Sequence, residues 1–142
     1  MLKEIFTADL ACATRVVGHS MIPTLKNHQI CIYNPFSRKF RRGDIVIAET
    51  DTAHIVKRII AVEGEHIHIS RNGSVTVNEK RLDEPYIFPQ SRPGKIIDTV
   101  VPSGHVWLMG DNRGASTDSR ERGAVHTKYI LGKLILRKRG EK

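Results

Sequence analysis

The chain has 142 residues, enough for one domain with a single core and few for two, and its formal net charge is +8. That charge favours polyanionic partners such as anionic lipid, nucleic acid or acidic protein, without choosing among them. No stretch approaches the roughly 20 apolar residues of a membrane-spanning helix. Cys12 and Cys31 lack the spacing of a zinc or redox motif, so a zinc site and a redox site are both disfavoured.

A short helix is predicted in the first dozen residues, and a series of strands follows it. From Gln29 onward, short runs rich in β-branched residues recur between turn signals, and few windows have helical periodicity. The predicted strands span residues 29–33, 44–49, 53–62, 66–70, 74–77, 96–101, 105–109 and 130–137. The chain is therefore predicted to be mostly β, with antiparallel sheets and little helix.

The middle of the chain contains the clearest turn signals. In "HISRNGSVTV", Asn72 and Gly73 can both take positive φ and close a tight hairpin. Residues 79–95 contain several prolines and read as an extended connection. We expect residues 1–142 to form a single domain, with 71–104 as a reduced hairpin and extended lobe.

The stretch "GHSMIPTL" places Ser20 in a turn, because Pro23 stops regular structure soon after it. By itself the segment is typical of an ordinary turn serine. A catalytic role would require a base close to the hydroxyl, and that base would have to come from elsewhere in the chain.

The strand "HIVKRIIAV" offers such a base. Alternation places Lys57 on one face with Ile55, Ile59 and Ala61. The ammonium group either extends to water at a sheet edge or is buried. Burial would lower the pKa of the lysine and allow it to take a proton from a serine without a histidine.

The stretch "GDNRGASTDSR", residues 110–120, follows a predicted strand and is rich in charged and hydroxyl side chains. Many such segments are only polar turns. Two arginines among two aspartates, with hydroxyls between them, are also suited to a rigid hydrogen-bonded loop that holds neighbouring groups in place.

Taken in order, Ser-Met-x-Pro-Thr-Leu, Gly-Asp-Ile-Val, Lys-Arg on a strand and Gly-Asp-Asn-Arg-x-x-Ser-x-Asp-Ser-Arg resemble the type I signal peptidase family. That family includes bacterial leader peptidases and mitochondrial inner-membrane peptidases, and the resemblance covers about residues 16–136. It implies a partly open, signal-peptidase-like barrel. It also implies a serine endopeptidase that removes signal peptides from exported preproteins after small residues, with no cofactor and no metal.

Carried over residue by residue, the resemblance implies a Ser-Lys dyad, with Ser20 as nucleophile and Lys57 as general base. Ser116 takes the place of the serine that orients the lysine amine in the family. Asp118 and Arg120 take the place of a structural ion pair. The implied substrate-binding residues are Met21, Pro23 and the strand Gly43, Asp44, Ile45, Val46, Ile47 and Ala48, which would pair with the substrate backbone and line small pockets.

Two segments depart from the family pattern. Gly18 stands where several members have a serine that donates to the oxyanion, so the resemblance implies an oxyanion site built from the Ser20 amide with a second amide at Gly18. In "KRIIAVEGE", Ala61, Glu63 and Glu65 replace a glycine, a proline and an aspartate of the pattern. These replacements alter a turn and remove no catalytic group.

The implied partners are preprotein signal peptides and the anionic lipid of a membrane surface. A basic cluster, which consists of Arg38, Lys39, Arg41 and Arg42, together with Phe36 and Phe40, is the predicted lipid-facing segment. The resemblance implies a monomer whose active site faces the outer side of the cell membrane. The family's N-terminal anchor helices are not found in this chain.

The sequence disfavours three other functions. Self-cleaving repressor-type peptidases cut at Ala-Gly or Cys-Gly upstream of the serine, and neither dipeptide precedes Ser20. Non-catalytic assembly factors related to signal peptidases lose the serine or the lysine, whereas this chain has both. A nucleic-acid-binding β-barrel is disfavoured because no aromatic stacking pattern accompanies the basic runs.

Overall fold

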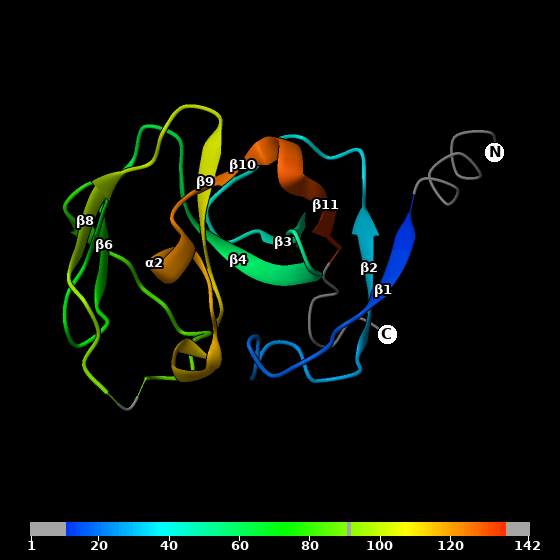
Figure 1. The fold of residues 1–142 in the computed structure, drawn as a ribbon, viewed down its shortest axis with the longest axis horizontal. Helices are drawn as coiled ribbons and strands as arrows, with labels where there is room; N and C mark the ends of the chain where they lie inside the picture. Colours follow the sequence, from blue (N-terminus) through cyan, green and yellow to red (C-terminus); the bar gives the residue numbers. More distant parts are fainter. Residues whose placement is uncertain (1–10, 91, 136–142) are drawn as a thin grey trace.

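The computed structural model describes residues 11–90 and 92–135 (Figure 1). The strands are β1 Cys12–Arg15, β2 Ile30–Asn34, β3 Ile45–Glu49, β4 His54–Val62, β5 His66–Ile69, β6 Val75–Val77, β7 Lys80–Arg81, β8 Ile97–Val100, β9 His105–Met109, β10 Val125–His126 and β11 Ile130–Leu134. The helices are short: α2 Ser119–Arg122 and the 3-10 turns η1 Arg113–Ala115 and η2 Thr127–Tyr129.

The strands form two antiparallel sheets that lie side by side (Figure 1). Sheet A has the order β1-β2-β11-β3-β4-β9-β10 and curls into a half-barrel, and sheet B has the order β7-β6-β5-β8. Because 40% of the described residues are in strands and 8% in helices, the predicted mostly β, antiparallel fold is confirmed. Sheet B begins at His66, so it includes β5 as well as strands of the lobe expected at 71–104.

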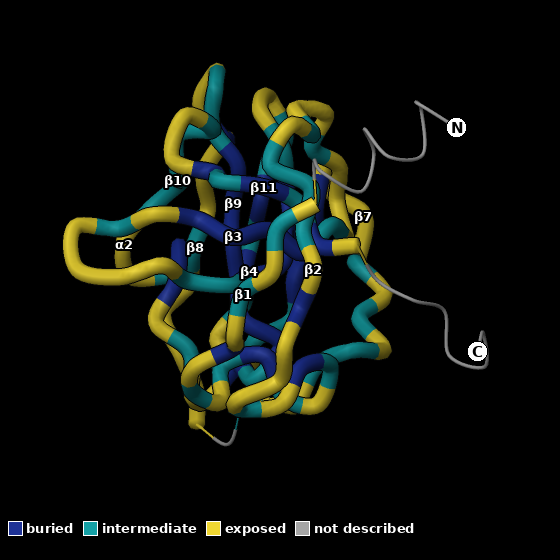
Figure 2. The backbone as a smooth tube through the Cα atoms, turned by 90° about the vertical axis from the view of Figure 1, so that its right-hand side faces the viewer, coloured by how far each residue is buried: buried dark blue, intermediate teal, exposed yellow. Residues whose placement is uncertain are grey.

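Buried apolar side chains join the two sheets. One cluster contains Ile60 and Trp107 from sheet A, and Ile67 and Val75 from sheet B. A second cluster packs Met21 and the strands β2, β3 and β11 together beneath the segment that carries Ser20. Figure 2 shows the buried strands of sheet A running through the centre of the molecule, with exposed loops around them. Burial of these apolar faces is the main stabilising contribution to the fold.

Each predicted strand is present, and its ends lie within one residue of the prediction in every case but the last. The strand predicted at 130–137 ends at Leu134, and residues 136–137 lie outside the described residues. Strict alternation along β4 fails, because a bulge between Ile59 and Ala61 shifts the register against β9. Ile59 therefore packs with one core cluster and Ala61 with another. The predicted N-terminal helix falls largely on residues 1–10, outside the described residues, and Cys12 begins strand β1 instead.

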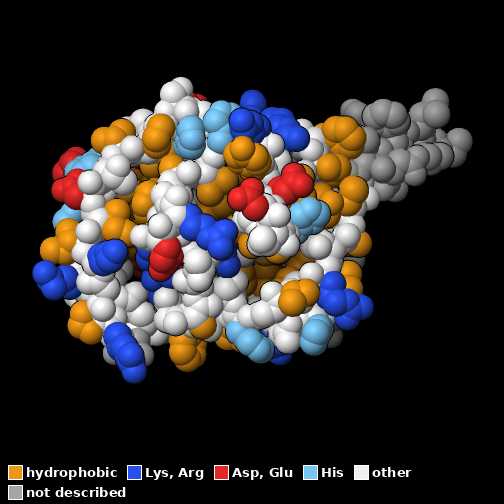
Figure 3. Space-filling view, in the orientation of Figure 1, with side chains coloured by type: hydrophobic (Ala, Val, Ile, Leu, Met, Phe, Trp, Pro, Cys, Tyr) orange, Lys and Arg blue, Asp and Glu red, His pale blue; other side chains and the backbone are white. Residues whose placement is uncertain are grey.

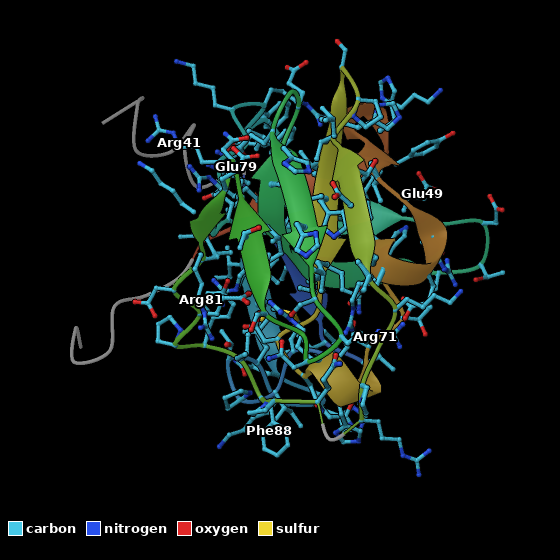
Figure 4. All side chains as sticks on the ribbon, turned by 90° about the vertical axis from the view of Figure 1, so that its left-hand side faces the viewer. Arg41, Glu49, Arg71, Glu79, Arg81 and Phe88 are labelled. Atoms are coloured by element: carbon cyan, nitrogen blue, oxygen red, sulfur yellow. The ribbon has the colours of Figure 1, made fainter. Side chains whose placement is uncertain are left out.

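The β5–β6 hairpin is present, but its turn differs from the prediction. Only Gly73 has positive φ, at 90°, and Asn72 does not. The Asn72 side-chain oxygen accepts hydrogen bonds from Ser70 Oγ and the Ser74 amide, which allows an ordinary turn with a glycine after it. Figure 4 shows this turn, labelled by Arg71, and the Glu79 turn at opposite ends of sheet B.

Three short strands, β1, β7 and β10, were not predicted. Strands β7 and β10 have two residues each, too few for an alternating pattern, and β1, CATR, contains a single β-branched residue. Over residues 11–90 and 92–135, no helix has the length and apolar character needed to cross a membrane.

Candidate active site

Ser20 lies on a compact turn between β1 and β2. The Ile22 amide donates to His19 O and the Leu25 amide to Met21 O, at 3.2 and 2.9 Å. Met21 and Leu25 are buried and anchor the turn on sheet A, while Ser20 stays half-buried. Gly18 has a φ of 97°, a conformation that favours glycine, where the chain leaves β1 for this turn.

Lys57 reaches Ser20 from strand β4. Its Nζ lies 2.8 Å from Ser20 Oγ, although the two residues are 37 positions apart in sequence. The lysine is only 5% exposed. Burial lowers the pKa of Lys57; the negative charge of Asp118 opposes this shift and the positive charge of Arg120 adds to it. The two side chains are thus arranged for proton transfer from the hydroxyl to a lysine that is more easily neutral than usual.

The loop at 110–120 folds around the carboxylate of Asp118. Arg120 forms an ion pair with it at 2.9 Å, the Gly110 amide donates to it, and Ser116 Oγ donates to it at 2.7 Å. Burial by itself would raise the pKa of Asp118, but the hydrogen bonds and charge of Arg120, with those two further donors, hold it below the usual value. Among the described residues Ser116 is hydrogen-bonded to Asp118 and not to Lys57, so its predicted contact with the amine is absent from this structure.

A second buried carboxylate, Asp111, ties this loop to the strand of the base. Arg58 binds it with two hydrogen bonds of 2.8 and 2.7 Å, and Thr24 Oγ1 donates to it at 2.5 Å. The Arg58 guanidinium also lies 3.8 Å from the centre of the Tyr86 ring. This network links the Ser20 segment, β4 and the loop, and fixes them relative to one another. The sequence reasoning assigned no role to Arg58, Thr24 or Tyr86.

Within the connection at 79–95, residues 84–88 form hydrogen bonds and an ion pair with the same loop. The Phe88 amide donates to Asp111 O, and the Arg113 amide donates to Phe88 O. Arg113 also forms a buried ion pair with Glu84. Residues 84–88 therefore form a segment that supports the loop from outside.

The predicted substrate strand, Gly43–Ala48, is paired on both sides over Val46–Ala48. Strand β3 pairs with β4 from Ile45 to Glu49 and with β11 from Val46 to Ala48, so no further strand can add to the backbone there. The prediction of main-chain pairing at Gly43–Ala48 is corrected by this topology, because sequence identifies a strand but not its neighbours. Ile47 still lines the cavity beside Ser20.

Two free edges do border the nucleophile. Strand β4 pairs with β9 only from Arg58 onward, which leaves residues 54–57 unpaired on that side. Across the cavity, Val16 directs its N–H and C=O toward β2, so Arg15 and Val17 direct theirs outward. Between these edges lies a cavity of about 100 Å³ lined by Thr14, Arg15, Val16, Val17, Ser20, Met21, Ile47, His54, Ile55, Val56 and Lys57.

The predicted oxyanion donors differ in availability. The Gly18 amide donates to Asn27 Oδ1 at 2.9 Å and is therefore occupied. Within the described part of the chain, the Ser20 amide has no acceptor among the hydrogen bonds formed. Pro23 follows the nucleophile on its turn and is exposed, whereas Met21 lines the cavity.

Comparison with known proteins gives consistent matches. The family described as "Signal peptidase, peptidase S26" matches residues 5–138. The chain is 35% identical over 141 residues to signal peptidase I of Bacillus caldolyticus, covering 86% of this chain and 76% of that protein. It is 33% identical over 126 residues to mitochondrial inner membrane protease subunit 1 of Xenopus tropicalis, and the match covers 84% of this chain and 64% of that protein.

A solved structure shares the fold. The crystal structure of a signal peptidase I from Enterococcus faecalis superposes with a TM-score of 0.60 at 24% identity, and the match covers 69% of this chain and 98% of that one. The match supports the half-barrel architecture described above.

Proposed function

The chain belongs to the signal peptidase family, peptidase S26, and we propose that Ser20 and Lys57 are the Ser-Lys dyad with which it removes signal peptides from preproteins. Membership makes the chain a serine endopeptidase of the signal peptidase I type. The observation that carries the assignment of the dyad is the 2.8 Å contact between Ser20 Oγ and the amine of a buried lysine.

In the proposed mechanism, neutral Lys57 takes the proton of Ser20 as the hydroxyl oxygen attacks the scissile carbonyl carbon. An unperturbed lysine is neutral in only about 1 of 2500 molecules at pH 7, so the lowered pKa of Lys57 matters for the rate. The lysine then donates a proton to the leaving amine. In the second half-reaction it takes a proton from the water that hydrolyses the acyl-enzyme.

The oxyanion of each tetrahedral intermediate is assigned to the Ser20 amide. Donors that are fixed before the reaction stabilise developing charge without reorganising. The Gly18 amide is bonded to Asn27 and needs to be released before it could contribute. The Ser20 amide is therefore the main donor in this proposal.

The substrate is proposed to lie extended between the free edge of β4 at 54–57 and the outward edge of β1 at Arg15 and Val17. The part before the cut is the better occupant, because it must remain bound through both half-reactions while the amine departs. The cavity is small, about 100 Å³, and this limited space supports cleavage after small residues such as alanine.

We further propose that the enzyme works as a monomer on the outer face of the cell membrane. The basic cluster lies on exposed chain, and Phe36 beside it is 65% exposed, a combination that suits anionic lipid. Figure 3 shows a small group of lysine and arginine side chains at the top of one face, with others spread over the rest of that face. Phe40, which was also predicted to face lipid, is half-buried against the core and is removed from this proposal.

The decisive experiment incubates the protein with a preprotein in detergent and identifies the products by mass spectrometry. Ser20→Ala and Lys57→Ala are each expected to abolish cleavage while the circular dichroism spectrum stays that of the wild type. Cleavage by either variant would contradict the dyad. Cleavage after large residues would leave the dyad in place and contradict the small-residue rule.

A further inference from the structure

Asn112 donates hydrogen bonds to two backbone carbonyls at the nucleophile, one from its side chain and one from its backbone amide. Its Nδ2 donates to His19 O at 3.1 Å, and its backbone amide donates to Ser20 O at 2.9 Å. The carbonyls of His19 and Ser20, which lie 93 and 92 positions before Asn112 in sequence, are thus held by one residue. The sequence assigned Asn112 only a place in a motif and no chemical role.

The planarity of the peptide unit gives this contact a consequence for catalysis. The carbonyl of His19 and the amide of Ser20 belong to the same peptide, and in a trans peptide the C=O and N–H point in opposite directions. A donor that fixes His19 O therefore also fixes the direction of the Ser20 N–H. A hydrogen bond to the carbonyl further polarises the amide and strengthens it as a donor.

Asn112 can act as a rigid reference because its own backbone is held on several sides. The loop residue before it, Asp111, is fully buried and bonded to Arg58 and Thr24. The Ala115 amide donates to Asn112 O at 3.0 Å. By comparison, the only other donor to His19 O among the described residues is the Ile22 amide of the same turn, at 3.2 Å, which moves with the nucleophile.

We propose that Asn112 is a positioning residue for the oxyanion site, which aims and polarises the Ser20 amide through the carbonyl of His19. This inference rests on the proposed function, in which Ser20 is the nucleophile. It assigns the asparagine side chain to stabilisation of the transition state and not to the binding of substrate or the activation of Lys57.

The test compares Asn112→Ala and Asn112→Asp with wild type on a preprotein-derived peptide. Removing a direct oxyanion donor costs about 100-fold or more in kcat, so loss of an indirect support is expected to lower kcat by about 10-fold. KM and the midpoint of the pH–rate profile should stay unchanged. Asn72→Asp, in the β5–β6 turn, adds the same charge elsewhere, keeps its acceptor oxygen and is expected to match wild type.

A peptide aldehyde separates positioning from a general loosening of the fold. Ser20 Oγ adds to the aldehyde carbon, the C=O π bond breaks, the serine proton passes to Lys57 and the former carbonyl oxygen carries the negative charge. Affinity for the aldehyde should fall about 10-fold in the Asn112 variants, in step with kcat. Affinity for an uncleaved peptide should be equal in Ser20→Ala and in Ser20→Ala with Asn112→Ala.

Wild-type kcat in both Asn112 variants would overturn the inference while the proposed function stands. A shift of the pH midpoint in place of the loss of aldehyde affinity would do the same. A fall in uncleaved-peptide affinity equal to the fall in aldehyde affinity would assign Asn112 to the fold and also overturn it. If instead Ser20→Ala cleaves the peptide, the proposed function itself fails.

Discussion

Lys57 and Arg58 are neighbours on β4, and both are buried, but the protein accommodates their charges differently. Arg58 stays charged and is matched by the carboxylate of Asp111 and the ring of Tyr86. Lys57 is hydrogen-bonded to a neutral hydroxyl, and burial lowers its pKa. An arginine cannot be neutralised and must be paired, whereas a lysine can lose its proton and become a base.

The burial of Lys57 predicts a conflict between stability and activity. Lys57→Met keeps the apolar volume without an ionisable group, so we expect an inactive protein whose free energy of unfolding is about 1 kcal/mol higher at pH 7. The unfolded wild type binds the lysine proton more tightly than the folded protein does, so wild-type stability rises with pH. The advantage of the variant should therefore shrink as the pH approaches 10.5, the ordinary pKa of lysine.

Urea unfolding at several pH values measures this difference. Lys57→Leu serves as the second apolar variant, to separate the loss of charge from any special fit of methionine. A lower unfolding free energy in both variants at every pH would contradict the argument that burial of the lysine is costly.

At the level of elements, strand β4 is paired on both sides in its second half but only on one side in its first half, which borders the active site. Its second half is a central strand between β3 and β9, and its first half is an edge beside Ser20. An unpaired edge exposes N–H and C=O groups that an extended peptide can satisfy. The edge ends at Lys57, so a paired substrate strand ends close to the nucleophile.

This edge predicts that the substrate backbone matters as much as its side chains. Peptides that are N-methylated at one of the two residues before the cut lose an N–H without a change of side chain. We expect at least one such peptide to show a KM raised about 5-fold or more, since a lost hydrogen bond costs about 1 kcal/mol. Methylation at a residue well after the cut is the control, and equal KM values for all of the peptides would argue against strand addition.

At Gly110, the 110–120 loop passes so close to Ser20 that a side chain at this position would not fit. A Cβ added at Gly110 would lie 2.3 Å from Ser116 Oγ and 2.6 Å from Ser20 O. Gly110→Ala is therefore expected to displace the Ser20 carbonyl and lower kcat/KM about 10-fold or more, because small misplacements of reacting groups are costly.

Gly114 provides the matched control in the same loop. A Cβ there would lie 3.8 Å from its nearest neighbour, an ordinary contact. Gly114→Ala should retain wild-type kcat/KM in the same peptide assay. Equal activity of the two alanine variants would show that the close approach of Gly110 is not needed for catalysis.

For the molecule as a whole, the surface combines net positive charge with exposed apolar side chains. The charge is +8, and Ile30 and Ile32 on the outer face of β2 are exposed together with Phe36. Isolated exposed apolar residues are ordinary, but apolar residues next to a basic cluster suit the interface of an anionic bilayer.

This surface predicts salt-dependent binding to anionic liposomes. Retention should be high at low salt, fall at about 0.5 M salt and be weak on neutral liposomes, because salt screens exposed charges. Phe36→Ser with Arg38→Ala should reduce retention several-fold in a flotation assay. Arg71→Ala, at the turn of sheet B, is the control with one fewer charge, and failure of wild type to float at low salt would contradict the proposal.

Local signals in the sequence were enough to predict the longer strands, the mostly β fold and the order of motifs that resembles a signal peptidase, because alternation and turn chemistry are local properties. The sequence also identified Ser20 and Lys57 as candidates. It could not give the neighbours of β3, the free edge of β4 or the bulge after Ile59, since strand pairing depends on contacts between distant segments.

Only the tertiary structure decided how the candidates meet. The contact between Ser20 and Lys57, the burial that lowers the lysine pKa and the hold of Asn112 on the nucleophile all join segments tens of residues apart. A residue type and its position in a motif limit the possible chemistry. The distance, burial and direction of each group are set by packing of the whole chain, and these determine whether proton transfer and oxyanion stabilisation can occur.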